Sequence, residues 1–356
     1  FRLMQARPLP LSVFGLAALL PLPLLLLGIA EGRAWLWPAF LYMGALTILL
    51  DQLVPLTSGS AEGEEFPASD LLLLAVGLSS LALLPLATWA IAGDSGLEPG
   101  ERLLLFLAAG FWLGQVAHPA AHELIHRPSR ALFRLGATVY VALLFGQHAS
   151  AHRLVHHRAV ATRDDPNTAR EGESFYRFAR RAWIGSFREG ARAETRLRPG
   201  RPGPHPYAYY LAGSAAALVL ASLVAGLAGP LAWLGLALHA QSQILLSDYV
   251  QHYGLTRRPL LSGKPEPVGP GHSWNTAHWF SSAMMLNAPR HSDHHSNPSR
   301  PFPALRLPAD APRLPWPLPL ACMIALLPRV WRRAMAPRLA ALRNSRPSAA
   351  LPDTSA

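Results

Sequence analysis

The sequence has very little cysteine and very little lysine: Cys322 and Lys264 are the only residues of these types among 356. A single cysteine excludes an intramolecular disulfide and an iron–sulfur or rubredoxin-type iron centre held by several cysteines of this chain. If the chemistry of the protein requires electrons, another protein must supply them. Charged residues are also scarce, at 15% against about 25% in soluble proteins. Together with 51% hydrophobic residues, this composition is typical of a membrane protein.

Apolar segments long enough to cross a bilayer, which takes roughly 20 residues, recur along the chain. The sequence therefore predicts an all-α polytopic membrane protein with about six transmembrane helices. A short basic stretch before the first segment resembles a signal peptide, but further apolar segments follow, so we expect a first spanning helix instead. The predicted spans are at about 9–29, 34–54, 69–93, 101–125, 207–228 and 231–252.

Arginine is distributed unevenly along the chain. Residues 127–205 contain fifteen arginines, no lysine and six acidic residues. The positive-inside rule places such a segment in the cytoplasm. No nucleic-acid-binding motif accompanies the net charge of +11, so we exclude nucleic acid as a partner. We expect one membrane-embedded domain over 1–310, with a cytoplasmic helical cap formed by 126–206 and 253–310. The Pro- and Arg-rich tail, 311–356, is predicted to be partly disordered, above all at 347–356.

Nine of the fifteen histidines stand out, because eight form three closely spaced motifs and His252 ends the last predicted span. Residues spaced by three or four positions share one face of a helix. The apolar segment 131–147 separates the first motif from the second. If it crossed the membrane, the motifs would face opposite sides, so we expect it to lie against the inner leaflet. The motifs are His122-Glu-Leu-Ile-His126, His152-Arg-Leu-Val-His156-His157 and His291-Ser-Asp-His294-His295.

These nine histidines imply two metal ions, because one ion takes four to six ligands. Neutral imidazole suits iron, zinc or copper. Taken alone, His122-Glu-Leu-Ile-His126 matches the H-E-x-x-H motif of zinc metalloproteases. A long apolar segment leads into it, however, and the other histidines compete for a single zinc ion. A membrane metal transporter is a non-enzymatic alternative, but transporter ligands lie near the bilayer midplane, whereas every motif here follows the end of a span.

At this point the sequence resembles the integral-membrane alkane 1-monooxygenases, within the membrane fatty-acid desaturase/hydroxylase superfamily. The resemblance covers roughly 35–310. Besides the three motifs, it rests on Val160-Ala-Thr-Arg-Asp-Asp-Pro-Asn-Thr-Ala-Arg170, Asp248-Tyr-Val-Gln-His-Tyr-Gly-Leu255 and His272-Ser-Trp-Asn275. The last two segments favour a hydroxylase over an acyl-chain desaturase. Ala151, Val155 and Gln251 replace residues usual in the family. These departures leave a methyl-aromatic substrate open, as in the related xylene monooxygenases.

The resemblance implies a non-haem diiron centre that uses O₂ to hydroxylate the terminal methyl group of a hydrophobic substrate entering from the bilayer. It also implies that rubredoxin or a ferredoxin-type protein, served by an NAD(P)H-dependent reductase, brings electrons to the cytoplasmic side of a bacterial inner membrane. The implied iron ligands are His122, His126, His152, His156, His157, His252, His291, His294 and His295. The residues expected to position these imidazoles are Glu123, His148, Asp164, Asp165, His272, Asn275 and Asp293.

Overall fold

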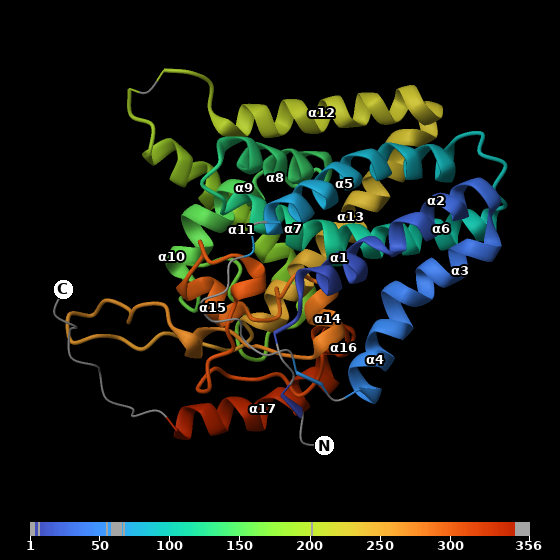
Figure 1. Cartoon of the computed structure of the whole chain (residues 1–356). Coiled ribbons are helices and arrows are strands. Elements are labelled where there is room, and N and C mark those ends of the chain that lie inside the picture. Colours follow the sequence, from blue (N-terminus) through green and yellow to red (C-terminus); the bar gives the residue numbers. More distant parts are fainter. Residues whose placement is uncertain are drawn as a thin grey trace.

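The computed structural model describes residues 4–5, 8–54, 56–57, 66, 68–200 and 202–345, and this part of the chain is almost entirely helical (Figure 1). Two strands of two residues each, β1 (Met4–Gln5) and β2 (Leu56–Thr57), pair in parallel. The predicted all-α class is confirmed, and these short strands are the exception to it among the described residues.

The first four predicted spans form helices that are long and apolar enough to cross a membrane. Two of them contain a π-helical turn. The first comprises α1 (Leu11–Leu19) and α2 (Pro21–Glu31). The second comprises α3 (Arg33–Leu41), η1 (Tyr42–Leu46) and α4 (Thr47–Leu53). The third is α5 (Ser69–Ala92), and the fourth comprises α6 (Pro99–Trp112), η2 (Leu113–Ala117) and α7 (His118–Ile125).

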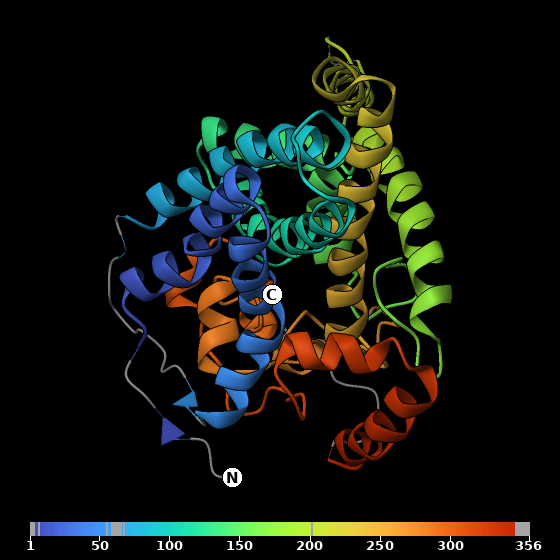
Figure 2. The ribbon, with the colours of Figure 1, turned by 90° about the vertical axis from the view of Figure 1, so that its right-hand side faces the viewer.

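The fifth apolar stretch, Pro206–Gln251, is 46 residues long and contains the last two predicted spans. It divides into α12 (Pro206–Ala225), the 3₁₀ turn η4 (Gly226–Ala228) and α13 (Gly229–Gln251). The division falls at Gly226, whose φ of 63° suits a residue without a side chain. In Figure 2, which looks nearly along α12, α13 inclines steeply away from it toward the histidine-rich end. The chain is therefore a multi-pass membrane protein.

The ambiguous segment 131–147 contains α8 (Arg130–Ala142), which has 13 residues. A helix of this length extends about 20 Å, less than the hydrocarbon core of roughly 30 Å. It packs against α5, α7 and α12. Its length agrees with the prediction that this segment does not cross the membrane.

Short helices, most of which carry histidines, gather at one end of the bundle, at the left and centre of Figure 1. They are α9 (His148–Ala151), η3 (His152–His156), α10 (His157–Ala159), η5 (Pro270–His272), α14 (Trp279–Met284), α15 (His291–Ser296) and η6 (Phe302–Ala304). The amphipathic helix α11 (Phe175–Arg196) flanks them and packs against α9 and α13.

The segment predicted as a tail contains two helices, α16 (Leu318–Ala325) and α17 (Pro328–Asn344). Trp331 of α17 is fully buried, with its ring 5.5 Å from that of Tyr253. Leu339, also on α17, lies so close to Gly254 that any side chain at position 254 would collide with Leu339. This packing explains why a Pro- and Arg-rich segment is ordered up to Ser345. The stretch 347–356, for which disorder is predicted, lies outside the described residues.

A buried carboxylate joins the second span to the cap. Asp51 accepts hydrogen bonds from the backbone nitrogens of Phe280 (2.9 Å) and Ser281 (3.2 Å) at the start of α14. Replacing it in Asp51→Leu leaves these donors unpaired. We expect a loss of about 1–3 kcal/mol in the free energy of unfolding, measured by thermal unfolding in detergent. Asp51→Asn keeps an acceptor oxygen and is the matched control; equal losses in both variants would contradict this role.

Candidate metal centre

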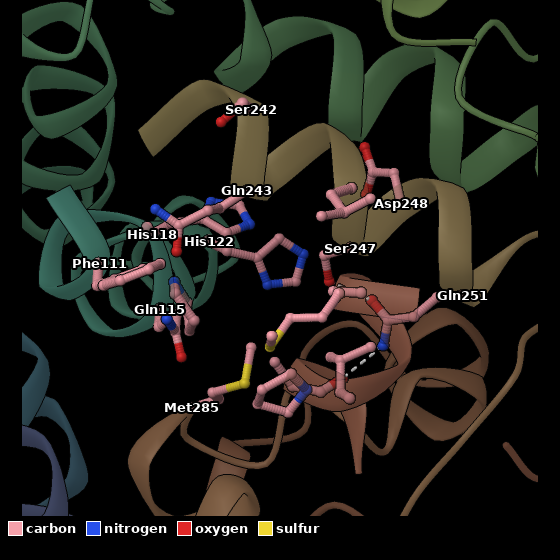
Figure 3. A pocket seen from close by; sticks show the side chains of 18 of the residues that line it. Phe111, Gln115, His118, His122, Ser242, Gln243, Ser247, Asp248, Gln251 and Met285 are labelled. Carbon is pink, nitrogen blue, oxygen red and sulfur yellow. Dashed lines mark hydrogen bonds between the residues drawn. The ribbon is translucent and has the colours of Figure 1, made fainter. Parts of the chain in front are cut away.

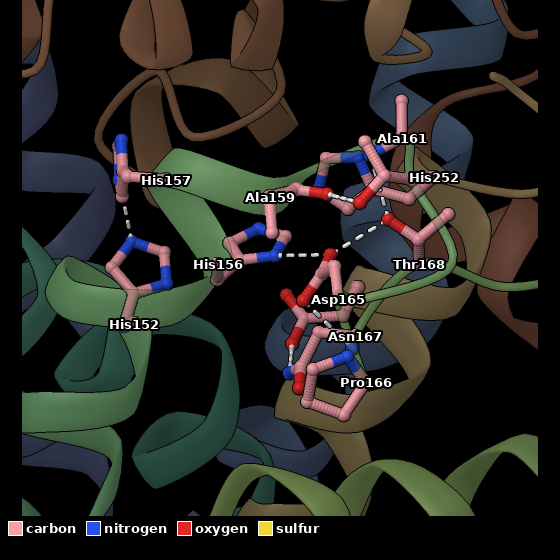
Figure 4. A network of polar contacts seen from close by, with 12 residues as sticks. His152, His156, His157, Ala159, Ala161, Asp165, Pro166, Asn167, Thr168 and His252 are labelled. Carbon is pink, nitrogen blue, oxygen red and sulfur yellow. Dashed lines mark hydrogen bonds and ion pairs between the residues drawn. The ribbon is translucent and has the colours of Figure 1, made fainter. Parts of the chain in front are cut away.

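The nine histidines singled out in the sequence lie together in two groups, and within each group the candidate ligand nitrogens are within 4.8 Å of one another. Figure 4 shows His152, His156, His157 and His252, which come from segments far apart in the sequence. The first group contains His122, His126, His152, His157 and His294. The second contains His156, His252, His291 and His295.

The local helix geometry divides the second and third motifs between the groups, whereas both histidines of the first motif lie in the first group. The second motif lies on η3 and α10, where a π-helical turn directs His152 and His157 to the first group and His156 to the second. Such turns are rare and frequent at functional sites. On α15, the chain places His294 in the first group and His291 and His295 in the second. Because two short helices each serve both groups, the two sites are held side by side.

The distances between imidazole nitrogens fit metal ions better than hydrogen bonds. His152 Nε2 lies 2.7 Å from His122 Nε2 and 2.9 Å from His157 Nε2, and His157 Nε2 lies 3.2 Å from His294 Nε2. A neutral imidazole nitrogen has either one proton or one lone pair, so it cannot satisfy two such neighbours. One ion about 2.0–2.1 Å from each nitrogen would use all their lone pairs.

The second group shows the same convergence. His291 Nε2 lies 3.0 Å from His252 Nε2 and 3.1 Å from His295 Nε2. Within the part of the chain that the structure describes, His156 Nε2 is buried without a hydrogen-bond partner, and the His156 ring centroid is 4.8 Å from that of His295. Within the described chain, every candidate ligand in both groups is an imidazole. Such a set of ligands suits iron, zinc or copper. The residues therefore fit two metal ions.

Burial keeps these imidazoles in the form that binds metal. It lowers the pKa of His252 to about 3 and holds the pKa values of His152 and His295 well below the usual range. Neutral imidazole carries the lone pair that a metal accepts. His156 differs: burial lowers its pKa, but the nearby Asp165 carboxylate outweighs burial, so its pKa is raised. A positive charge on His156 is thus favoured, and a metal ion on Nε2 would supply one.

Two of the acids predicted to position imidazoles lie against them. Asp165 Oδ2 is 2.8 Å from His156 Nδ1 and accepts from the Thr168 hydroxyl at 2.6 Å (Figure 4). Glu123 Oε1 is 3.9 Å from His294 Nδ1, and Glu123 Oε2 accepts from the Phe302 backbone nitrogen at 3.1 Å. Asp165 therefore fixes the His156 ring with Nε2 toward the second group. Glu123 lies beyond hydrogen-bond distance of His294 and instead binds the backbone at Phe302.

Asn275 and Asp293 hold α15 rather than an imidazole. Asn275 Oδ1 accepts from the backbone nitrogen of Ser292 at 2.9 Å, and Asn275 Nδ2 donates to the Ser292 hydroxyl at 2.6 Å. Asp293 accepts from Arg300 Nη1 at 2.5 Å and from the backbone nitrogen of Arg306 at 2.7 Å. Both therefore position the helix that carries three of the nine histidines.

The remaining predicted positioning residues differ in their contacts. His272 places its carbonyl oxygen 3.4 Å from His252 Nδ1, while its ring pairs with Glu266 at 3.0 Å. His148 stacks on His152 with centroids 5.0 Å apart. Asp164 is exposed, and within the described part of the chain it contacts none of the nine imidazoles.

Asp248 is a buried acid that sequence reasoning missed. It lies on α13, accepts a 2.6 Å hydrogen bond from Asn167 Nδ2 and so ties this span to the loop that carries Asp165. An acidic residue inside an apolar span is costly unless it has a partner or a function. Its position inside an apolar segment is therefore the sequence feature that marks Asp248.

A cavity of about 470 Å³ reaches the histidines from within the membrane-spanning helices (Figure 3). Its walls come from α4, α6, α7, α13 and α16, and it ends at His122, His152 and His291. Met43, Ile48 and Phe111 line its apolar part. Because it touches members of both groups, a hydrophobic molecule inside it would lie next to both candidate metal positions.

The fold and the convergent imidazoles define a membrane-embedded metalloprotein, and comparison with known proteins specifies it further. Residues 102–317 match the fatty acid desaturase family. The chain is 30% identical over 327 residues to alkane 1-monooxygenase 2 of Pseudomonas aeruginosa, covering 88% of this chain and 87% of that protein. It is 32% identical over 273 residues to alkane 1-monooxygenase of Pseudomonas putida, with 75% and 67% covered. The hydroxylase component of the xylene/toluene monooxygenase of Pseudomonas putida is 28% identical over 325 residues, with 86% and 83% covered.

The chain belongs to the membrane alkane 1-monooxygenase family, within the fatty acid desaturase superfamily. It is therefore an oxidoreductase with a histidine-rich metal centre. Membership implies a hydrophobic substrate, O₂ and an electron donor.

The contact between Asp165 and His156 predicts a metal-binding phenotype. Asp165→Ala frees the imidazole to rotate, and we expect an affinity for Zn²⁺ or Fe²⁺ lowered about 10- to 100-fold at one of the two sites, measured by titration against a chelator. Asp164→Ala is the matched control, because the neighbouring acid is exposed. Identical affinities in the two variants would contradict a positioning role for Asp165.

Proposed function

We propose that the protein is a non-haem diiron monooxygenase that hydroxylates the terminal methyl group of alkanes. The convergence of nine buried or partly buried imidazoles in two adjacent groups, which an apolar cavity reaches, carries this proposal. In the balanced reaction, R–CH₃, O₂, two electrons and two protons give R–CH₂OH and water. One C–H bond is broken, one oxygen atom enters the substrate and the other is reduced to water.

The nine histidines are proposed as the ligands, five for one iron and four for the other. Iron bound there would supply the oxygen-activating redox chemistry that the side chains themselves lack. Asp165 fixes the His156 ring, Glu123 binds the backbone at Phe302 beside His294, and Asn275 fixes the start of α15. The ligand geometry therefore depends on contacts from α7, from the loop after α10 and from the segment before α14.

The cavity orients the substrate by excluding water along its apolar part. Phe111 and Met43 give no hydrogen bond to an alkyl chain, so the chain's position is set by shape and by the length of the cavity. A chain that extends along the cavity would place its end, rather than its middle, beside His122, His152 and His291. This arrangement favours a terminal carbon as the site of reaction.

A methyl-aromatic substrate is the second candidate, because the xylene/toluene monooxygenase hydroxylase component is similar over 86% of the chain. Both reactions insert oxygen into a methyl group next to the same histidines. An acyl-chain desaturase would instead give an alkene. The identity of the product separates the three: an aliphatic alcohol, a benzylic alcohol or an unsaturated acyl chain.

The electron donor is proposed to be rubredoxin or a ferredoxin-type protein with its NAD(P)H reductase, at the cytoplasmic face of a bacterial inner membrane. Cys322 is the only cysteine, so the chain cannot bind a cluster of its own. Arg153 and Arg158 are exposed beside His152 and His157, and Arg163 is exposed in the following loop. This basic surface next to the first group suits an acidic carrier.

The diiron monooxygenase is tested by metal content and products on one purified sample. We expect two irons per chain and an oxygen-dependent terminal alcohol when rubredoxin, its reductase and NADH are supplied with octane, dodecane or p-xylene, as detected by gas chromatography. His126→Ala and His295→Ala should each lower the iron content toward one per chain and abolish the alcohol. His205→Ala, a control outside both groups, should retain two irons. One zinc per chain with no alcohol from any donor would overturn the proposal.

The basic surface predicts that electron delivery depends on salt. Raising the ionic strength should slow electron transfer from an acidic donor, because screening weakens its attraction to the arginines. Arg163→Glu should raise the KM for the donor several-fold with little change in kcat, measured with the donor as varied substrate. Arg33→Glu changes an exposed arginine at the opposite end of the bundle and should have no effect. A response equal for both variants would exclude docking at Arg163.

A further inference from the structure

Pairs of imidazoles face each other between α7 and the segment α9-η3-α10. The ring centroids of His126 and His157 are 4.7 Å apart, and those of His122 and His152 are 4.4 Å apart. One helical turn earlier on both segments, His118 and His148 form a third pair at 5.7 Å. The first two pairs belong to the first metal group. The third belongs to neither group, although both of its members line the cavity.

His148 presents a nitrogen that the protein does not satisfy. Its side chain is 2% exposed, and it is held between the rings of Phe145 and His152, with centroids at 5.2 and 5.0 Å. His148 Nε2 is buried and has no hydrogen-bond partner among the described residues. A buried nitrogen without a partner is costly, and its presence requires an explanation. A neutral imidazole ring has one donor and one acceptor, so His148 can still bind a polar atom.

His118 presents a donor, because Tyr140 fixes its tautomer. The Tyr140 hydroxyl is fully buried, and within the described chain its hydrogen-bond partner is His118 Nδ1 at 2.9 Å. A buried phenol satisfies its proton by donating it, so His118 Nδ1 accepts. The imidazole proton is then on Nε2. His118 is partly exposed and lines the cavity, where Figure 3 shows it beside His122, so its N–H is available to a molecule in the cavity.

We propose that His118 and His148 bind an oxygen atom of the substrate, one helical turn away from the candidate metal ligands His122 and His152. This inference rests on the proposed function and specifies its substrate class. The preferred substrates are hydrophobic molecules that carry an ether, carbonyl or hydroxyl oxygen about 5 Å, one turn of helix, from the methyl group that is oxidised. A plain alkane of the same length leaves both imidazoles without a partner.

Dibutyl ether and nonane form a matched pair of probes. They have the same length and shape, and the ether places an acceptor oxygen at the middle of the chain. Both are given together to the complete system with its electron donor, and the ratio of ether-derived to alkane-derived alcohol is measured. His118→Leu and His148→Leu should each lower this ratio roughly 3- to 10-fold, the effect of one net hydrogen bond. Comparing the ratio between variants cancels the unequal partition of the probes into detergent.

Two milder variants separate hydrogen bonding from a general effect on packing. His118→Gln keeps an N–H donor and should retain most of the ether preference. Tyr140→Phe leaves the imidazole in place but frees its tautomer, so the preference should fall, though less than in His118→Leu. Should His118→Leu fail to fold, the same comparison is made with His148→Leu. Unchanged ratios in the Leu variants would overturn the inference and leave an ordered water as the partner of both imidazoles.

A binding measurement is independent of turnover. With metal removed by a chelator, the affinity of the protein for dibutyl ether should fall about 3- to 10-fold in His118→Leu, while its affinity for nonane should not fall. Equal affinities of wild type and variant for the ether would overturn the inference. Absence of product from both probes in the wild type would overturn the proposed function instead, because binding of the ether is measured without iron.

Discussion

The convergence of nine imidazole rings within a few ångströms is the constraint on which the rest of this structure depends. Nitrogens at 2.7–3.2 Å cannot all satisfy one another, because each has only one proton or one lone pair. Such an arrangement is stable only with metal ions and with neighbours that prevent the rings from rotating. The π-helical turn η3, the contact of Asp165 with His156 and the anchoring of α15 by Asn275 all serve this need.

The same constraint explains the division of the molecule into two parts. The spans supply His122, His126 and His252 at their ends, and the cap supplies the other six. The cavity approaches the histidines through the spans, whereas exposed arginines surround them on the cap. The histidines therefore have an apolar cavity on the side of the spans and exposed basic residues on the side of the cap. Asp51 and Asp248 connect the two parts by capping α14 and by binding the loop that carries Asp165.

Hydropathy and residue spacing predict the spans and the nine histidines, because both are properties of short stretches of sequence. Contacts between segments that are distant in the sequence cannot be predicted in this way. Asp164 and Asp165 are equivalent in the sequence, yet one is exposed and the other meets His156, since the turn after α10 directs only one of them inward. Likewise, α17 is ordered by the fit of Trp331 against Tyr253 and of Leu339 against Gly254, which composition cannot show.

The four-residue spacing also includes two histidines, His118 and His148, that belong to neither metal group. His118, His122 and His126 recur every fourth residue, as do His148, His152 and His156. On two facing helical segments this repeat continues the row of imidazoles beyond the first metal group and into the cavity. A row that served only the metal would end where the ligands end, and apolar residues would suit an alkane better beyond that point. The additional pair is explained if the molecule in the cavity itself carries a polar atom at that distance from the reacting carbon.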